Sequence, residues 1–233
     1  MNNILVLIFL IIPQYSRASE TLSNLITDAR VLASDASSVT RQRFSDTQIT
    51  EFLNQAQRQA LFESRCLMSS LSFTLTAGVT YYSLPSNYMS MERATIGSLW
   101  MTELTPAALD GRSRGWEASS GHPTYYFINF SSRGLIGFAP WPATSTDTDT
   151  IKIEYQIQAN DLANSTDIPF NGITELQEFH HGLAYYAAGM MEMINGMTSQ
   201  ASAYFSNFQT IVKNMNMACR LRPNYMPSAV ASP

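Results

Sequence analysis

The spacing of apolar residues changes twice along this chain of 233 residues, and this change constrains the fold more than any other feature. Apolar side chains recur every three or four residues over 20–33 and 45–66, as on one face of an α-helix. From Phe73 to Ile157 they alternate with polar residues, as in half-buried strands, and from 174 to 219 the helical spacing returns. The sequence therefore predicts an α+β chain in which strands separate two pairs of helices.

Two helix starts carry the same local signal. Ser45 with Gln48, and Thr174 with Gln177, have the spacing of a capping box, in which each side chain accepts a hydrogen bond from the other residue's backbone N–H. An apolar stripe follows each pair. We therefore expect helices to begin at these two places.

The order of elements predicts a division into five segments. Each helical pair has a broad apolar stripe that it cannot bury alone, so we expect 20–68 and 161–220 to pack into one four-helix bundle. Residues 69–160 contain short candidate strands between loops rich in Gly, Ser and Pro, which favours an inserted small β-barrel or sandwich. Extended arms, 1–19 and 221–233, are expected at the two ends.

Six short segments are candidate strands. Phe73–Thr76 and Tyr81–Leu84 flank Gly78 and predict a β-hairpin. Residues 111–122 are predicted to form a loop. The other candidate strands are Met91–Ile96, Tyr125–Phe130, Leu135–Phe138 and Ile151–Ile157.

The N-terminal segment permits two interpretations. Ile4–Ile12 is an uninterrupted apolar run, which is too short for a bilayer span of about 17–25 residues. Ser16 and Ala18 have the small-x-small spacing of a signal-peptidase site, although Met1–Asn3 contain no Lys or Arg. Either the segment is a cleaved signal peptide, or it is a retained arm that a neighbouring subunit buries, through Ile4, Leu5, Leu7, Ile8, Phe9 and Leu10.

The low charge of the chain excludes two classes of protein. Only 14% of residues are charged and the net charge is -4, while apolar residues make up 45%, so neither a disordered chain nor a free-standing basic nucleic-acid binder is expected. Hydroxyl and amide side chains replace the missing charges, and a partner covers such a surface at a smaller desolvation cost. This composition favours a subunit of an assembly.

Candidate catalytic groups are few. His180 and His181 are adjacent, so on a helix they point about 100° apart, whereas a helical zinc pair needs i, i+4 spacing. His180 shares an apolar stripe with Leu183, which predicts a buried structural histidine. Cys66 and Cys219 lie at predicted helix ends, where packed free thiols are favoured over a cross-link. We predict no catalytic residue, no cofactor and no metal site.

One loop combines residues that are common in interfaces. Arg112, Arg114 and Trp116 lie within a span of five residues, inside a stretch rich in Gly and Ser. They could anchor a protein contact or stack on single-stranded nucleic acid. The other interpretation, which is favoured, is a tryptophan folded onto the β insert with solvated arginines around it.

Seven segments follow one another in a fixed order along the chain: Phe73–Pro85, Met91–Ile96, Gly121–Tyr125, Gly137–Pro142, Ile153–Tyr155, Asp161–Phe170 and Phe179–His181. Together they resemble the adaptor, or head-to-tail connector, proteins of tailed bacteriophages. The resemblance covers about residues 20–220. Each segment alone is moderately specific, and their order between two helical pairs is more telling.

The resemblance implies a structural virion protein without catalytic residues. It implies a ring of about twelve copies that joins the portal protein to tail nozzle, tail-tube or tail-fibre proteins, with double-stranded DNA passing through the bore and no membrane partner. The loop 111–122 would face neighbours or tail proteins. The candidate portal-contact residues are Leu221, Arg222, Pro223, Asn224, Tyr225, Met226 and Pro227.

A rival hypothesis comes from the departures from this pattern. The apolar run Ile4–Ile12 and the low charge are unusual for the family. The alternative is an exported periplasmic or extracellular binding module, whose β insert carries the ligand surface. A mature N-terminus at Ser19 would distinguish it from a virion protein.

Overall fold

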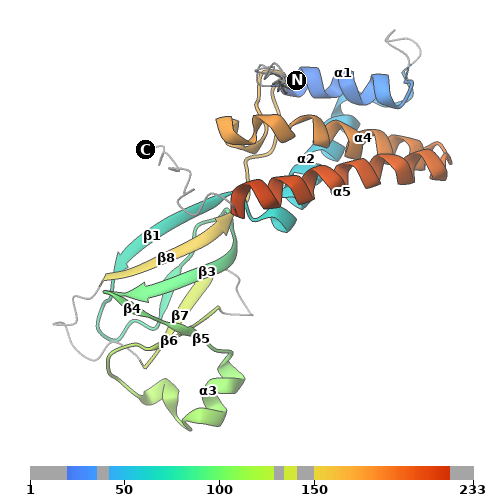
Figure 1. The fold of residues 1–233 in the computed structure, drawn as a ribbon. Helices are drawn as coiled ribbons and strands as arrows, with labels where there is room; N and C mark the ends of the chain where they lie inside the picture. Colours follow the sequence, from blue (N-terminus) through green and yellow to red (C-terminus); the bar gives the residue numbers. More distant parts are fainter. Residues whose placement is uncertain (1–19, 36–41, 129–133, 141–149, 221–233) are drawn as a thin grey trace, which may run out of the picture.

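A computed structural model describes residues 20–35, 42–128, 134–140 and 150–220. Over these residues the chain is α+β, with five α-helices and two sheets, and four of the helices lie at the opposite end of an elongated body from the strands (Figure 1). We call the end formed by α1, α2, α4 and α5 the helical region. The other end, formed by the strands and α3, is the sheet region.

Four helices share one core in the helical region. Helix α4 contacts the other three, and α2 also contacts α1 and α5. The apolar stripes recognised in the sequence face this core, where Leu25, Leu53, Leu183 and Phe208 are fully buried. The helices are α1 (Leu22–Leu32), α2 (Asp46–Ser64), α4 (His181–Ile194) and α5 (Thr198–Arg220).

The predicted start of α2 is confirmed. The Gln48 N–H donates to Ser45 Oγ at 3.2 Å, and the Ser45 N–H donates to Gln48 Oε1 at 2.9 Å. These two bonds satisfy backbone donors that the first turn of a helix leaves unpaired.

A helix does begin at Thr174, as predicted, but it is not an α-helix and the predicted capping box is not formed. Residues Thr174–Phe179 form a 3-10 helix, η4, which no side chain caps, and α4 begins only at His181. Just upstream, Phe170 and Asn171 have positive φ angles of 55° and 58°, and Phe170 is fully buried. Burying Phe170 therefore fixes the chain direction here and overrides the local capping signal.

The described residues of the sheet region form two four-stranded sheets. Neighbouring strands are antiparallel, except that β5 and β6 are parallel. The first sheet has the order β1 (Met68–Thr74), β8 (Thr150–Ile157), β3 (Tyr88–Ile96), β4 (Leu99–Trp100). The second has the order β2 (Tyr81–Ser83), β7 (Leu135–Ala139), β6 (Tyr125–Ile128), β5 (Thr102–Glu103).

The two sheets pack against each other through aromatic side chains. The ring centroid of Phe73 on β1 lies 5.0 Å from that of Tyr82 and 5.7 Å from that of Phe138. The chain crosses from one sheet to the other at the buried Met101, between β4 and β5. No backbone ladder joins the sheets among the described strands, so the barrel alternative of the prediction is wrong.

The predicted hairpin around Gly78 is also wrong. Strand β1 pairs with β8 and β2 pairs with β7, so the turn at Gly78 carries the chain from one sheet to the other. Strand β8 lies between β1 and β3, where Ile151 and Ile153 are fully buried. Burying these two side chains needs a long-range strand pair, which the local turn signal cannot indicate.

A short helix interrupts the segment between β5 and β6. Thr105 Oγ1 accepts the Ala108 N–H at 3.2 Å, and Pro106 occupies the first turn of α3 (Pro106–Arg112). The 3-10 helix η2 (Trp116–Ala118) follows. The predicted loop 111–122 therefore contains helical structure that its Gly and Ser content concealed.

Candidate functional site

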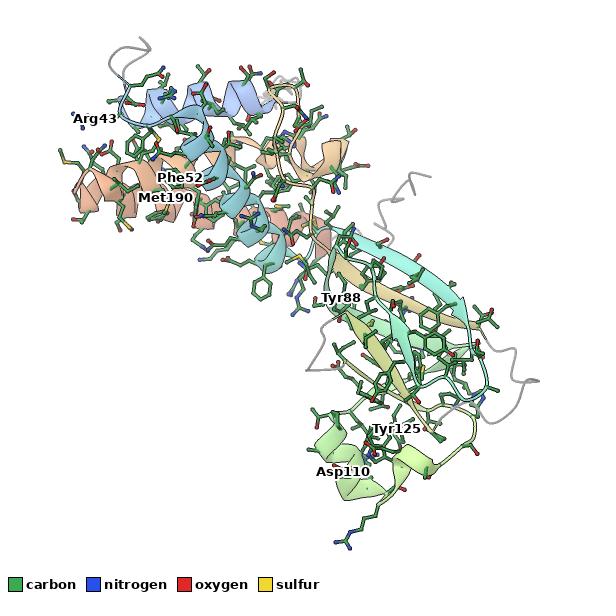
Figure 2. The ribbon with its side chains drawn as sticks, turned by 180° about the vertical axis from the view of Figure 1, so that it is seen from behind. Arg43, Phe52, Tyr88, Asp110, Tyr125 and Met190 are labelled. Atoms are coloured by element: carbon green, nitrogen blue, oxygen red, sulfur yellow. A yellow bond between two sulfur atoms is a disulfide. The ribbon has the colours of Figure 1, made fainter. Side chains whose placement is uncertain are left out.

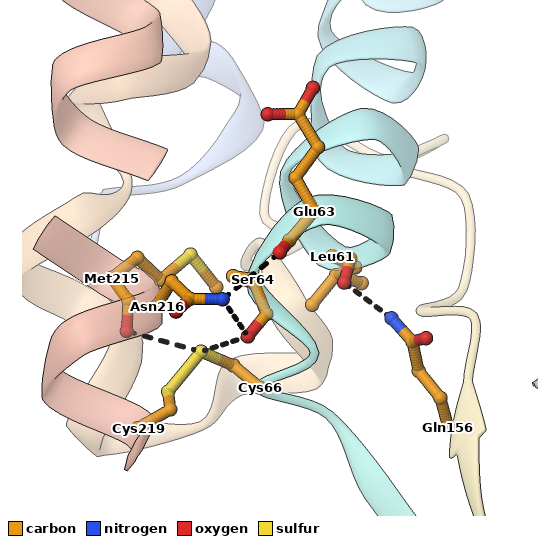
Figure 3. Close-up of a disulfide and its surroundings, with 8 residues drawn as sticks. All are labelled: Leu61, Glu63, Ser64, Cys66, Gln156, Met215, Asn216 and Cys219. Atoms are coloured by element: carbon orange, nitrogen blue, oxygen red, sulfur yellow. Dashed lines mark hydrogen bonds between the residues drawn. A yellow bond between two sulfur atoms is a disulfide. The ribbon is translucent and has the colours of Figure 1, made fainter. Parts of the chain in front are cut away.

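The helical and sheet regions meet at a neck, which we define by the ends of α2 and α5, the start of β1 and the end of β8. Cys66, after α2, forms a disulfide with Cys219 in the last turn of α5, with the two Cα atoms 5.6 Å apart (Figure 3). The prediction of free thiols is therefore wrong. The two helix ends are distant in sequence but adjacent in the fold, which the spacing of the cysteines could not indicate.

A buried glutamine connects β8 to the end of α2. The Gln156 side-chain amide donates to the Leu61 carbonyl oxygen (Figure 3), and Gln156 Oε1 accepts the Ser90 hydroxyl of β3 at 2.9 Å. Only 1% of Gln156 is exposed. A buried amide whose donor and acceptor are both satisfied holds one geometry, so Gln156 fixes the first sheet relative to α2.

The side-chain amides of two residues in α2, Asn54 and Gln57, bind the segment that returns from β8 to the helical region. The Asn54 side chain donates to the Leu162 carbonyl oxygen at 3.0 Å and accepts the Leu162 N–H at 2.8 Å. The Gln57 side chain donates to the Asn160 carbonyl oxygen at 2.9 Å and accepts the Phe170 N–H at 2.8 Å. Asn54 and Gln57 therefore hold the returning backbone as a neighbouring strand would.

The neck is held by covalent and polar contacts on several sides. The Asn216 side-chain amide donates to the carbonyl oxygens of Glu63 and Ser64 at 3.0 and 3.1 Å, which ties α5 to the end of α2 (Figure 3). Each of these contacts joins segments far apart in sequence. These contacts hold the helical and sheet regions together at the neck.

The α3 lobe, which we define as Leu104–Ser119, lies at the end of the sheet region farthest from the helices, where Figure 2 labels Asp110 and, beside the lobe, Tyr125. Its core is separate from the main core and includes Leu109, Trp116 and Phe127. The Trp116 Nε1–H donates to Asp110 Oδ1 at 2.8 Å, and its ring meets Phe127 edge-on at 5.2 Å between centroids. The structure thus places Trp116 inside the lobe.

Both arginines singled out in the sequence are exposed on the α3 lobe. The Arg112 guanidinium lies over the Tyr125 ring, 5.5 Å from its centroid, and donates to the Tyr125 hydroxyl at 3.2 Å. Trp116 is buried, so it does not share a surface with Arg112 and Arg114. The structure agrees with the favoured interpretation, in which the tryptophan folds onto the β insert.

A second exposed surface was not anticipated from the sequence. Leu99 and Trp100, on the edge strand β4, are 61% and 72% exposed. The Arg93 guanidinium lies 5.1 Å from the centre of the Trp100 ring. An exposed tryptophan beside an arginine is typical of protein interfaces. In the sequence, Gly97 stands two residues before Leu99 and could have indicated a turn into a short edge strand here.

Arg93 also forms an ion pair with the buried carboxylate of Glu154. Glu154 Oε2 lies 2.5 Å from Arg93 Nη2, and Glu154 Oε1 lies 2.9 Å from Lys152 Nζ. Burial alone would raise the pKa of Glu154, but the hydrogen bonds from the two cations outweigh burial and lower that pKa below its usual value. The outer face of the first sheet therefore carries two cations and one carboxylate beside Trp100.

The predicted burial of His180 is confirmed. His180 is fully buried against the Phe170 ring, at 5.6 Å between centroids, and burial lowers its pKa to about 4. Within the described residues, no group of three or more His, Cys, Asp or Glu side chains could hold a metal ion. In the same part of the chain, no helix is long and apolar enough to cross a membrane.

Two predicted sets of contact residues lie outside the described residues. They are the apolar set within Ile4–Leu10 and the C-terminal set Leu221–Pro227. Arg220, the last residue of α5, borders a cavity of about 400 Å³ at the neck, together with Arg65, Met68 and Glu92. Arg220, the last described residue, therefore lies at the neck, beside the start of β1.

Comparison with known proteins places the whole described fold within one family. The sequence model described as SU10 adaptor protein matches residues 20–231, which includes both regions and the neck. No curated protein matches the chain.

Proposed function

The chain belongs to the SU10 adaptor protein family, a phage head–tail adaptor family, and from this premise we propose that it is a structural component of the virion neck that joins the portal to the tail. The observation that carries the proposal is the continuous family match across the helical region, the neck and the sheet region. An adaptor has to bind at both ends and keep their relative position. The disulfide and buried amides of the neck supply such a coupling.

The proposed architecture is a four-helix bundle with the sheet region as its insert. The helical contacts support one bundle formed by both helical pairs, since α4 contacts α1, α2 and α5. The sheet region leaves the bundle after α2 and returns before α4. Both connections therefore pass through the neck, where their backbone groups are bound.

We propose that the subunit assembles as a ring of about twelve copies, as the resemblance implies. The exposed pair Leu99 and Trp100 supports a protein contact on the sheet region. The apolar arm, Ile4–Leu10, would give a second contact with a neighbour. Double-stranded DNA would pass through the bore without readout of its bases. A net charge of -4 per subunit favours such passage, because few basic side chains are available to bind the phosphates and slow the DNA.

The proposed partners lie at different parts of the subunit. Residues 221–227 would contact the portal protein. The exposed Arg112 and Arg114 of the α3 lobe would face tail proteins or a neighbouring subunit. In this function the protein has no catalytic residue and needs no cofactor.

Electron microscopy of the native particle tests the proposal. We expect class averages with a ring of this chain on the axis shared by portal and tail. Deleting residues 221–233 should abolish docking to the portal while the helical circular dichroism of the subunit persists. Loss of helicity together with docking, or particles in which the chain lies off the axis, would contradict the proposal.

One observation favours the second candidate, an exported binding module. A disulfide is common in periplasmic and extracellular proteins and rare in reducing compartments. N-terminal sequencing of the protein from its natural source distinguishes the two. A start at Ser19 on a monomer or small dimer would support export, and an intact N-terminus in a virion ring would exclude it.

A further inference from the structure

Strand β1 forms an open edge of the first sheet. It pairs with β8 on one side, and among the described strands it has no partner on the other. An open edge presents a row of backbone donors and acceptors that can bind another strand. This edge starts at the neck and runs over seven residues.

The strand pairing shows which backbone groups lie on the open edge. The Ile157 N–H donates to the Leu67 carbonyl oxygen at 3.0 Å. In an antiparallel pair the bonding direction alternates, so the odd-numbered residues of β1 face β8. The N–H and C=O groups of Met68, Ser70 and Ser72 therefore point away from the sheet.

The open edge lacks the usual protection against pairing. Native edge strands commonly carry lysine, proline or an inward charge, but the β1 sequence, MSSLSFT, has no charge and no proline. Leu71 and Phe73, whose side chains face the second sheet, are only half-buried. An added strand would cover both side chains as well as satisfy the backbone.

The C-terminal segment of the same chain begins next to this edge. Cys219 is bonded to Cys66, and the segment starts at residue 221 while β1 starts at Met68. Its 13 residues could extend about 43 Å at about 3.3 Å per residue, against about 23 Å for β1. The segment therefore starts at the right place and is long enough to follow the whole edge.

The prolines of the segment permit pairing along one side only. Pro223, Pro227 and Pro233 are all odd-numbered, so in an extended strand their missing N–H groups fall on the same side. The even-numbered residues keep every N–H on the other side. Proline is tolerated in edge strands when its position faces solvent. The sequence thus matches an outermost strand.

We propose that residues 224–232 add to the open edge of β1 in the same chain as a parallel strand. The direction is parallel because both segments leave the neck together, and α5 with the elements before it supplies the long connection that parallel strands require. This inference goes beyond the proposed function, since it concerns the free subunit. If residues 221–227 also bind the portal, the segment must first leave β1.

Amide hydrogen exchange on the isolated full-length chain, read by NMR, tests the proposal with two proline variants. Val230→Pro removes an even-numbered N–H and should release the strand, whereas Ala231→Pro changes an odd-numbered residue and should preserve it. We expect the Ser70 and Ser72 amides to exchange roughly tenfold or more faster in Val230→Pro than in the unmodified chain or Ala231→Pro. Leu71 and Phe73, which bond to β8, should be equally protected in all three.

The reciprocal variant acts on the other strand. Ser70→Pro removes an outward N–H of β1, and it should speed exchange at the even-numbered amides of 224–232. The proposal would be overturned if the amides of Ser70 and Ser72 exchanged at the same rate in Val230→Pro as in Ala231→Pro. Protection that rises with protein concentration would also overturn it, because a second copy would then supply the strand. Neither of these two results would count against the proposed docking to the portal, because the experiment uses the isolated chain without the portal protein.

Discussion

The side chain of Asn54 binds both backbone groups of Leu162, a residue 108 positions further along the chain. Leu162 belongs to the segment that returns from the sheet region, and both of its bonds to Asn54 are buried. One side chain thus replaces the partner strand that this backbone lacks. The position of the returning segment depends on α2.

Replacing Asn54 with alanine should lower the free energy of unfolding by about 2–3 kcal/mol, because the N–H and C=O of Leu162 lose their partner in a buried site. Urea denaturation followed by circular dichroism measures the change. Gln59→Ala is the matched control, since Gln59 is a half-buried amide on the same helix whose exposed hydrogen bond to Glu63 joins residues only four apart. Equal effects of the two substitutions would show that the Asn54–Leu162 pair contributes nothing specific.

The disulfide between Cys66 and Cys219 should stabilise the chain substantially. It closes a loop of 153 residues, so Cys219→Ser or reduction should lower the free energy of unfolding by about 2–5 kcal/mol. A thiol assay of the unreduced, unfolded protein should find no free thiol. Reductant should shift the unfolding midpoint of the unmodified chain and leave that of Cys219→Ser unchanged. A shift in both proteins would mean that the reductant acts elsewhere.

Local signals in the sequence predicted the parts of the fold that depend on local contacts. The capping box of Ser45 and Gln48 and the 3.6-residue apolar stripes located the helices, because helix hydrogen bonds join residues four apart. The hairpin around Gly78 failed for the opposite reason. The partners of β1 and β2 are β8 and β7, and no local pattern states which distant strand buries Ile151 and Ile153.

In the candidate site too, the sequence shows residue types, whereas the contacts between distant residues are shown only by the fold. Arg112, Arg114 and Trp116 were singled out by residue type, but only the fold shows that Trp116 bonds to Asp110 inside the lobe. The polar contacts of the neck were not predicted. Asn54, Gln57 and Gln156 are ordinary polar residues in the sequence, and their importance comes from backbone groups that are distant along the chain.

The close approach of α4 and α5 depends on glycine. A Cβ added at Gly189 would lie 2.8 Å from the nearest atom of the Phe205 ring, which is closer than real side chains tolerate. Gly189→Ala should therefore lower the free energy of unfolding by about 1–3 kcal/mol. Gly111→Ala in α3 meets no atom within 4 Å and should be neutral or stabilising by up to about 1 kcal/mol. Thermal unfolding of both variants makes the comparison, and a stabilising Gly189→Ala would contradict the described packing.

The buried His180 should make stability depend on pH. Burial lowers its folded-state pKa from the ordinary 6.5 to about 4, so between these values the unfolded chain binds a proton that the folded chain does not. Stability contributed by neutral His180 is therefore fully present above pH 6.5 and is lost as the pH falls toward 4, by about 3 kcal/mol in all.

Urea unfolding at a series of pH values between 4 and 7.5 measures this dependence. His180→Gln is the matched variant, because glutamine fills a similar volume and stays neutral over the whole range. The difference in unfolding free energy between the two proteins should shrink steadily as the pH falls below 6.5, since only the unmodified chain is penalised by protonation. A difference that stays constant with pH would mean that His180 accepts a proton in the folded chain as easily as in water, which its complete burial against Phe170 argues against.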